Sequence, residues 1–200
     1  MQSIDSTILN RIRGLGRGAV LAPSHFLDLG SRQAVDLALH RLMKKGTIRR
    51  LARGLYDYPR QDPELGLLNP TVEAIARAIK GRDATRIQPA GSYAANLLGL
   101  SDQVPVKVVF LTDGISRRIK LGKQEIVLKR TTPRNMATAG KISGLVIQAL
   151  RHLGRRHVDD DVILRLRVGV KDSDKKELLR GLRYAPAWIA AIMRGISQSK

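Results

Sequence analysis

Residues 31–59 read SRQAVDLALHRLMKKGTIRRLARGLYDYP, and the first half of this stretch has the pattern of an amphipathic helix. Its apolar residues recur at the helical spacing i, i+3, i+4 and i+7, namely Val35, Ala38, Leu39 and Leu42. Ser31 can cap the start of the helix, and Gly46 can end it. The stretch therefore predicts a helix that buries one face and presents a polar face to solvent.

The second half of the stretch has the pattern of a β-hairpin. Two short segments rich in strand-forming side chains, 47–51 (TIRRL) and 55–58 (LYDY), flank the turn Ala52-Arg53-Gly54. Three cationic side chains, Arg49, Arg50 and Arg53, lie in or beside this turn. We therefore expect a short basic hairpin directly after the helix.

The residues that precede this stretch complete a recognisable order of elements. The pattern predicts a first helix over residues 3–13, a strand at 19–21 that pairs with the hairpin, and a short second helix over 25–29 capped by Ser24. A helix, a short helix, a longer helix and a hairpin make up a winged helix-turn-helix, whose longer helix fits the DNA major groove. We interpret residues 1–60 as such a DNA-binding domain.

Within this motif, the first turns of the longer helix would meet base edges. Gln33 could pair with adenine through two hydrogen bonds, and Leu37 could contact a thymine methyl group. Cations further along the helix and in the hairpin would contact phosphates or the minor groove. The predicted DNA-contacting residues are Ser31, Arg32, Gln33, Asp36, Leu37, His40, Arg41, Lys44, Lys45, Arg49, Arg50 and Arg53.

Some of these side chains have a plain structural alternative. Asp36 could simply pair with Arg32 or His40 on the helix surface, and Arg41 could brace the hairpin. A charged helix face is usually only solvated. The coincidence of helix, turn and basic hairpin nevertheless favours DNA contact.

The charge of the chain points in the same direction. The 200 residues contain 36 Lys and Arg against 17 Asp and Glu, which gives a net charge of +19 and a pI near 11.2. Residues 1–60 hold eleven Lys and Arg against four Asp and Glu, so residues 61–200 carry the remaining +12. Such a balance indicates a polyanionic partner, with nucleic acid ahead of an anionic membrane surface or an acidic protein.

Composition also excludes several classes of site. The chain has no cysteine, which excludes disulfides, thiolate zinc sites and cysteine nucleophiles. The four histidines show no paired ligand spacing, so we expect no metal and no cofactor. The N-terminus lacks the apolar run of a signal peptide, and no segment approaches the ~18 apolar residues of a membrane span, so we expect a cytoplasmic protein.

The remainder of the chain reads as a mixed α/β domain with a C-terminal helical segment. The Pro- and Gly-punctuated connector at 60–70 predicts a boundary between domains 1–60 and 61–200, and the overall fold class is α+β. The near-continuous apolar run at 104–111 predicts a strand buried on both faces. The other predicted elements are helices at 70–80, 91–98, within 134–154, at 159–168, 173–183 and 186–196, and strands at 86–89, 116–121 and 125–130.

The hairpin predicted at 116–130 carries a second group of cations with Glu125 as the only acid between them. We call this group the second basic patch, and it comprises Arg117, Arg118, Lys120, Lys123, Lys129 and Arg130. Phosphate contact is one role for it, because the cations would crowd one short β-ribbon.

Evidence for an active site is weak. The run Asp159-Asp160-Asp161 suits the start of a helix better than a metal site, because consecutive helical residues point in different directions. Asp113, Glu125 and Lys129 loosely resemble a nuclease triad, but the spacing of the last two does not fit that chemistry. We therefore expect a protein that is not an enzyme, with a cryptic metal-dependent nuclease as a minor alternative.

The run at 30–59, GSRQAVDLALHRLMKKGTIRRLARGLYDYP, resembles the N-terminal winged helix of AbiEi-type antitoxins. The runs QPAGSYAANLLGLSDQVPVKVVFLTDG and RRIKLGKQEIVLKRTTPR look like the domain that follows it in small relatives, and together the resemblance covers most of residues 15–150. It implies a repressor of its own operon that binds promoter inverted repeats, with a homodimer on DNA as one arrangement. It also implies the antitoxin of a type IV toxin–antitoxin, or abortive infection, system, functionally linked to a nucleotidyltransferase-like toxin without a stable complex.

Carried over to this chain, the resemblance makes residues 31–45 the recognition helix and residues 49–53 the wing. The main alternative is an RNA-binding or ribosome-associated basic protein. Only 4% of the residues are aromatic, which is thin for the stacking platforms on which single-stranded RNA is bound.

Overall fold

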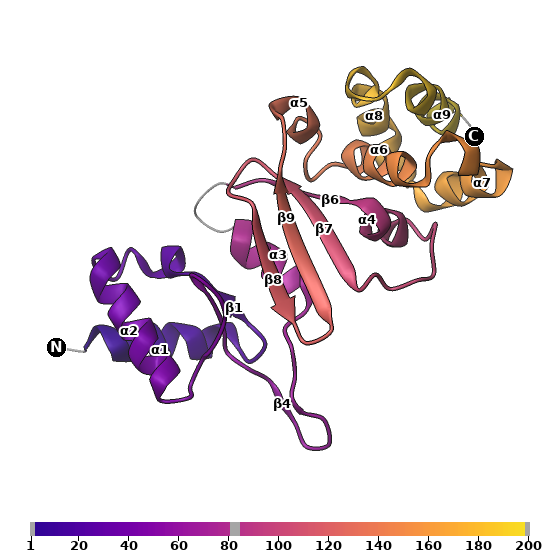
Figure 1. The fold of residues 1–200 in the computed structure, drawn as a ribbon. Coiled ribbons are helices and arrows are strands. Elements are labelled where there is room, and N and C mark those ends of the chain that lie inside the picture. Colours follow the sequence, from indigo (N-terminus) through magenta and orange to yellow (C-terminus); the bar gives the residue numbers. More distant parts are fainter. Residues whose placement is uncertain (1–2, 81–84, 199–200) are drawn as a thin grey trace. The chain divides into compact units, whose positions relative to one another are not determined.

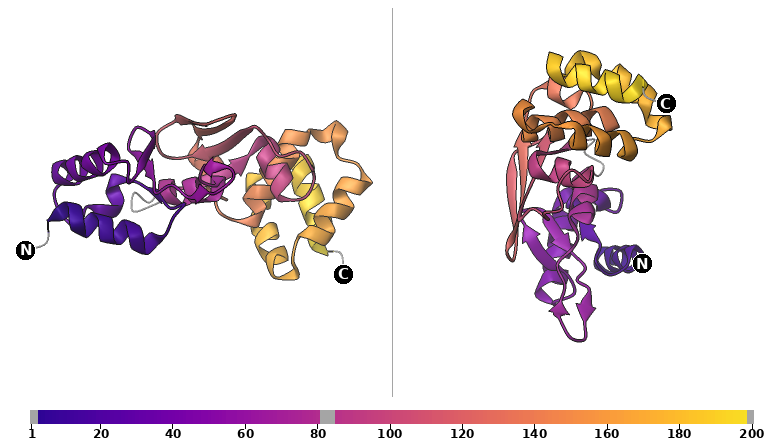
Figure 2. Two further views of the ribbon diagram at one scale, coloured as in Figure 1. Left: turned by 90° about the horizontal axis from the view of Figure 1, so that it is seen from below. Right: turned by 90° about the vertical axis from the view of Figure 1, so that its right-hand side faces the viewer.

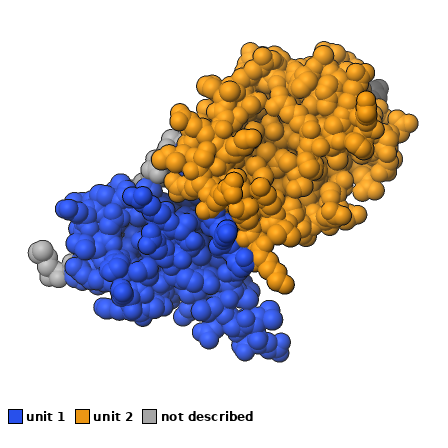
Figure 3. All heavy atoms as spheres, in the orientation of Figure 1, with its two compact units in different colours: residues 1–85, 119–122 blue, residues 86–118, 123–200 orange. Residues whose placement is uncertain are grey.

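The computed structural model describes residues 3–80 and 85–198 (Figure 1). These residues form helices and several small sheets, so the predicted α+β class is confirmed. The chain forms two compact units. The first comprises Met1–Thr85 with Ile119–Gly122, and the second comprises Arg86–Arg118 with Lys123–Lys200 (Figure 3).

The first unit begins with helix α1 (Ile4–Leu15), whose N-terminus is capped by Ser3 through a hydrogen bond from the Ser6 N–H. Strand β1 (Val20–Leu21) follows and leads into the 3₁₀ helix η1 (Pro23–Phe26). The predicted second helix over 25–29 is therefore wrong in type and position. Pro23 explains the earlier start, because its fixed φ and missing N–H suit the first position of a helix.

Helix α2 (Arg32–Lys44) confirms the predicted long helix of the first unit. Ser31 caps it by accepting a hydrogen bond from the Ala34 N–H at 3.3 Å. The four apolar residues of its predicted stripe are all buried. They form one core with side chains from α1, β1 and η1, among them Ile8, Ile12, Leu21 and Phe26.

Strands β2 (Arg49–Ala52) and β3 (Leu55–Asp57) form the predicted antiparallel hairpin. Gly54 lies in its turn with a φ of 67°, a conformation that favours glycine. Strand β1 pairs with β3, with Val20 opposite Asp57, so the predicted pairing is confirmed. The resulting sheet has the order β1-β3-β2.

The predicted connector at 60–70 contains a small hairpin of β4 (Gln61–Asp62) and β5 (Gly66–Leu67). Helix α3 (Val72–Lys80) follows. Both cluster with the first unit, where the Leu68 carbonyl accepts a hydrogen bond from Arg49. The compact units thus divide after Thr85 rather than in the connector, and the functional domains 1–60 and 61–200 stay a prediction.

A four-stranded sheet with the order β6-β7-β9-β8 organises the rest of the chain. Its strands are β6 (Ile87–Ala90), β7 (Lys107–Thr112), β8 (Arg117–Leu121) and β9 (Gln124–Arg130). Strand β7 runs antiparallel to β6 and parallel to β9. The predicted hairpin of β8 and β9 is confirmed.

The prediction that residues 104–111 are buried on both faces of the sheet is wrong. Val104 and Val106 precede β7 and are 78% and 67% exposed. Within β7, burial alternates, and Phe110 lies on the covered face against Tyr93, with ring centroids 5.5 Å apart. One face of β7 is therefore packed more tightly than the other, as the two-residue period of a strand allows.

Helices account for most of the second unit. They are α4 (Gly91–Leu97), α5 (Pro133–Met136), α6 (Ile142–Leu153), η2 (Arg155–His157), α7 (Asp160–Gly169), α8 (Asp172–Arg180), η3 (Leu182–Tyr184) and α9 (Ala187–Gln198). Helices α6 to α9 gather at one side of the sheet (Figure 2) and share a core that includes Val146, Leu166, Leu178 and Met193. Trp188 packs against this core.

Among the described residues, no helix combines the length and the apolar character that crossing a membrane would require.

Candidate nucleic-acid interface

Helix α2 presents its predicted polar face to solvent. All of the outward positions are exposed, namely Arg32, Gln33, Asp36, Leu37, His40, Arg41, Lys44 and Lys45. Leu37 is 54% exposed although it is a large apolar residue. Gln33, Leu37, His40 and Lys44 are spaced by four, three and four residues, so they form a single row along the helix. We call these four residues the α2 row.

Two cations of this face are paired with carboxylates. The Arg32 Nε lies 3.0 Å from Asp36 Oδ2, which confirms the surface pair considered for Asp36. The guanidinium of Arg41 donates to Asp5 Oδ1 of α1 at 2.9 Å, so Arg41 braces α1 rather than the hairpin. Both pairs are largely exposed and are worth little for stability.

In contrast to Arg32 and Arg41, the residues of the α2 row form no ion pair with a carboxylate of the described chain. Within residues 3–80 and 85–198, the side chains of Gln33, His40, Lys44 and the neighbouring Lys45 form no hydrogen bond or ion pair. The row therefore offers an amide, an apolar surface, an imidazole and an ammonium group. These are the kinds of group that contact base edges, thymine methyls and phosphates.

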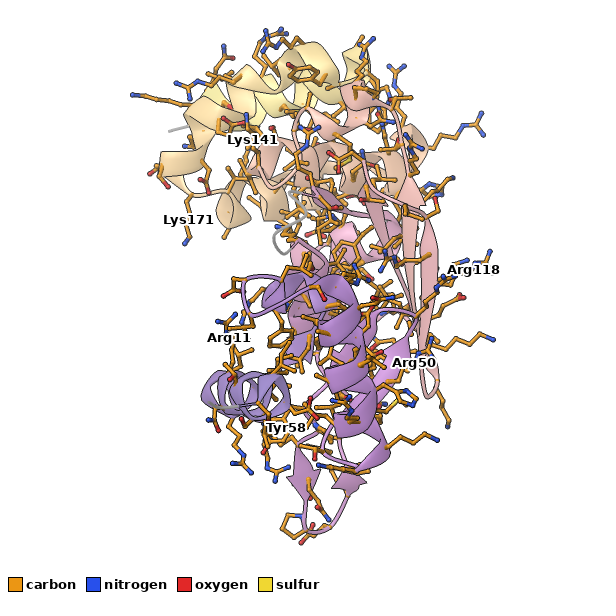
Figure 4. All side chains as sticks on the ribbon, turned by 90° about the vertical axis from the view of Figure 1, so that its left-hand side faces the viewer. Arg11, Arg50, Tyr58, Arg118, Lys141 and Lys171 are labelled. Carbon is orange, nitrogen blue, oxygen red and sulfur yellow. The ribbon has the colours of Figure 1, made fainter. Side chains whose placement is uncertain are left out.

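The hairpin contributes two exposed arginines, Arg53 in the turn and Arg50 on β2, which is labelled in Figure 4. Arg50 makes only a long contact, 3.5 Å, to the Ala52 carbonyl. Arg53 has no side-chain partner in the described part of the chain. Both guanidinium groups are thus available for an external anion.

Arg49 differs sharply from its neighbour Arg50. Its Nε and one terminal nitrogen donate to the two oxygens of Asp57, at 3.1 and 2.7 Å, and it also donates to the Leu68 carbonyl at 3.0 Å. The Asp57 side chain is 1% exposed. Hydrogen bonding to Asp57 raises the pKa of Arg49 above its usual value, partial burial opposes this rise, and the nearby negative charge adds to it.

The role predicted for Arg49 therefore needs revision, because its guanidinium is committed to holding the hairpin and the connector together. The sequence contained one signal for this contact. Asp57 is the only acid in the hairpin, and a lone acid on a half-buried ribbon needs a cation as partner.

The second basic patch is exposed at all six of its residues. Successive side chains of a strand point to opposite faces of the sheet. The apolar residues of the same two strands take the buried face, namely Ile119, Leu121, Ile126 and Leu128. Arg118 points away from the sheet (Figure 4) and lies 3.9 Å from Glu125, a loose contact.

A shallow hollow of the second unit lies beside this patch. Arg117, Arg118 and Lys129 line it together with Lys107 and the half-buried Val109 and Val127. Sequence analysis missed Lys107, because only the parallel register of β7 and β9, with Lys107 opposite Glu125, reveals that it joins these cations.

The structure does not assemble the loose nuclease triad. Asp113 follows the end of β7, whereas Glu125 pairs with Lys107 at its beginning, which separates the two positions by roughly 20 Å along the strand. Asp113 is instead held by Arg86, with a 2.7 Å contact to the Nε and a 2.8 Å hydrogen bond from the backbone N–H. The side-chain hydrogen bond from Arg86 lowers the pKa of Asp113.

The Asp159-Asp160-Asp161 run starts α7, and Asp159 accepts a hydrogen bond from the Val162 N–H at 3.0 Å, as a helix cap does. Within the ranges that the structure describes, no group of three His, Asp or Glu side chains could hold a metal ion.

Comparison with known proteins places the chain in a family. No curated protein matches it. A solved structure, that of the RV2827C protein from Mycobacterium tuberculosis, is similar with a TM-score of 0.46 and 17% sequence identity, and the match covers 100% of this chain and 78% of that one. The model of the family DUF6088, described as a family of unknown function, matches residues 7–178. The chain belongs to the DUF6088 family.

Proposed function

We propose that the chain is a sequence-specific transcriptional regulator that binds double-stranded DNA and is not an enzyme. The observation that carries this proposal is the α2 row, which is exposed, mixed in chemistry and unpaired within the described residues. In this proposal α1, η1, α2 and the β2–β3 hairpin act as a winged helix-turn-helix, with α2 in the major groove.

The α2 row supplies the contacts that distinguish one sequence from another. Gln33 can recognise adenine through its amide, and Leu37 can pack against a thymine methyl group. His40 and Lys44 lie further along and reach the flanking bases or phosphates. Ser31 and the Arg32–Asp36 pair lie at the start of the helix, where they orient its entry into the groove.

The remaining cations supply affinity that does not depend on sequence. In this proposal Arg50 and Arg53 on the hairpin and Lys45 after α2 contact phosphates, and Arg41, which pairs with Asp5, contributes positive charge nearby. The second basic patch adds further phosphate contacts, and all of its residues except Lys120 belong to the second unit. If the protein neutralises about 6 phosphates, the logarithm of affinity falls against the logarithm of salt concentration with a slope near −5.

The resemblance to AbiEi-type antitoxins supports a biological role for this binding. In that role the protein represses its own operon from promoter inverted repeats. It also acts as the antitoxin to a nucleotidyltransferase-like toxin in the cytoplasm, and it needs no cofactor.

A selection from random duplexes tests the proposal. The full chain is incubated with a pool of double-stranded oligonucleotides, bound duplexes are enriched, and the winner is compared with a scrambled duplex and with a structured RNA. We expect the selected duplex to bind at least 100-fold more tightly than the scrambled one. Failure to enrich any sequence, or tighter binding of the RNA, would refute a sequence-specific DNA-binding function.

A further inference from the structure

The first unit contains a hollow of about 530 Å³ away from the α2 row. The end of α1, strand β1, the segment that follows β5 and helix α3 form its walls. Much of its surface is apolar, with Val20, Leu68 and Ala74 among the contributing residues. A hollow of this volume is large enough for a small organic molecule.

Three arginines line the same hollow, and among the described residues that line it there is no Asp or Glu. Arg60 and Arg77 are exposed, and neither forms a side-chain hydrogen bond or ion pair within residues 3–80 and 85–198. Arg17 is fixed in place, because it donates to the Pro59 carbonyl at 3.0 Å and its guanidinium carbon lies 4.8 Å from the centre of the Tyr58 ring. The hollow thus combines one positioned guanidinium group with two that form no direct ion pair, although the charge of Arg60 acts on the exposed Asp62.

Helix α3 borders the hollow along its length, from Thr71 to Ala78, with Glu73 in its first turn. The first turn of α3 borders the hollow, and Thr71 caps this helix by accepting a hydrogen bond from the Ala74 N–H at 3.2 Å. The N-terminal end of a helix carries partial positive charge. His25 is a wall rather than a ligand, because its two ring nitrogens contact the Ala22 nitrogen at 3.4 Å and the Ala78 carbonyl at 3.2 Å.

The geometry points to a binding site for a small organic anion in this hollow. Its phosphate or carboxylate group pairs with Arg60 and Arg77, since a guanidinium group offers two parallel donors to such oxygens. Its compact apolar part packs on Val20, Leu68 and Ala74. An inorganic ion would leave that apolar surface in water, and the backbone of a DNA duplex has no apolar group to place in a hollow.

Titration calorimetry on the full chain with phenyl phosphate tests this site, with inorganic phosphate as the probe that lacks the apolar part. We expect phenyl phosphate to bind more tightly than inorganic phosphate. The double variant Arg60→Gln/Arg77→Gln should lose at least tenfold in affinity for phenyl phosphate, because two charge-assisted hydrogen-bonding groups are removed. Ala74→Leu, which keeps every charge and suits a helix, should weaken phenyl phosphate binding by filling the hollow.

The matched control is Arg13→Gln/Lys80→Gln. It removes the same amount of charge from exposed positions of α1 and α3 that do not line the hollow, and it should leave phenyl phosphate binding unchanged. The proposal is overturned if phenyl phosphate does not bind, if the control loses affinity equally, or if Ala74→Leu binds as the wild type does. It is also overturned if the Arg60→Gln/Arg77→Gln variant binds phenyl phosphate as the wild type does. The calorimetry contains no DNA, so its outcome is independent of the proposed regulatory function.

Discussion

Two regions of the molecule present cations to solvent, and they differ in what accompanies those cations. The exposed face of α2 mixes Gln33, Leu37 and His40 with lysines, and it also contains paired charges such as Arg32–Asp36. The second basic patch contains only Lys and Arg, with Glu125 nearby. Base edges are distinguished by amides and apolar groups, whereas phosphates require only positive charge. Within the proposed function, this difference suits α2 to sequence discrimination and the second basic patch to general affinity.

The largest effect should come from breaking the Arg49–Asp57 pair, which holds the hairpin that follows α2. Arg49→Gln leaves the buried Asp57 carboxylate without its cation, and we expect a loss of about 3 kcal/mol in the free energy of unfolding. Urea denaturation followed by circular dichroism measures this loss. Arg50→Gln is the matched control, because the neighbouring guanidinium makes only one long contact, and it should change stability by less than about 0.5 kcal/mol. Equal effects of the two substitutions would contradict the structural role of Arg49.

The next largest effect should come from neutralising three cations of the second basic patch. The triple variant Arg117→Gln/Arg118→Gln/Lys120→Gln should weaken binding to selected and scrambled duplexes by the same factor. Each lost phosphate contact should reduce the steepness of the salt dependence by about 1. Fluorescence anisotropy across a salt series measures both quantities. A loss confined to the selected duplex would mean that this patch reads sequence, and the division between the regions would fail.

A smaller and more selective effect should come from the first region. Gln33→Ala should reduce discrimination at one base pair by about 1–3 kcal/mol while leaving binding to scrambled DNA nearly unchanged. Binding to a set of single-base variants of the selected duplex measures this. Arg13→Gln, on the exposed surface of α1, serves as a control that should leave the base preference intact.

The smallest effect concerns acid stability in the second unit. Because Arg86 lowers the pKa of Asp113, this pair stabilises the fold above the pKa that Asp113 has in the unfolded chain. That contribution is lost as the pH falls through the lower pKa of the folded state. Asp113→Asn should therefore be less stable than the wild type at pH 7, and the difference should shrink by pH 2. We expect a small change in melting temperature, because both side chains are partly exposed. A difference that does not change with pH would contradict this assignment.

The sequence predicted the elements that depend on local pattern. The stripe of Val35, Ala38, Leu39 and Leu42 sufficed for α2 and its buried face, and Ser31 marked its start. The strands predicted at 116–121 and 125–130 correspond to β8 and β9. These elements could be predicted from the local sequence pattern, because periodicity and capping depend on residues that are neighbours in the chain.

The features that sequence analysis missed depend on contacts between distant residues. Lys107 joins the second basic patch only through the register of two parallel strands. Arg49 and Arg50 are adjacent and chemically identical, yet one is held by Asp57 and Leu68 while the other faces solvent. The hollow with Arg17, Arg60 and Arg77 combines three segments that no spacing rule connects.

The most direct test of the central claim is amide chemical-shift mapping of the full chain with the selected duplex. The account predicts that the backbone amides of residues 31–45 and the side-chain amide of Gln33 shift strongly with the selected duplex. With scrambled DNA, the larger shifts should come from the hairpin and the second basic patch. If the residues of α2 do not shift with any duplex, the proposal that this helix enters the major groove is contradicted.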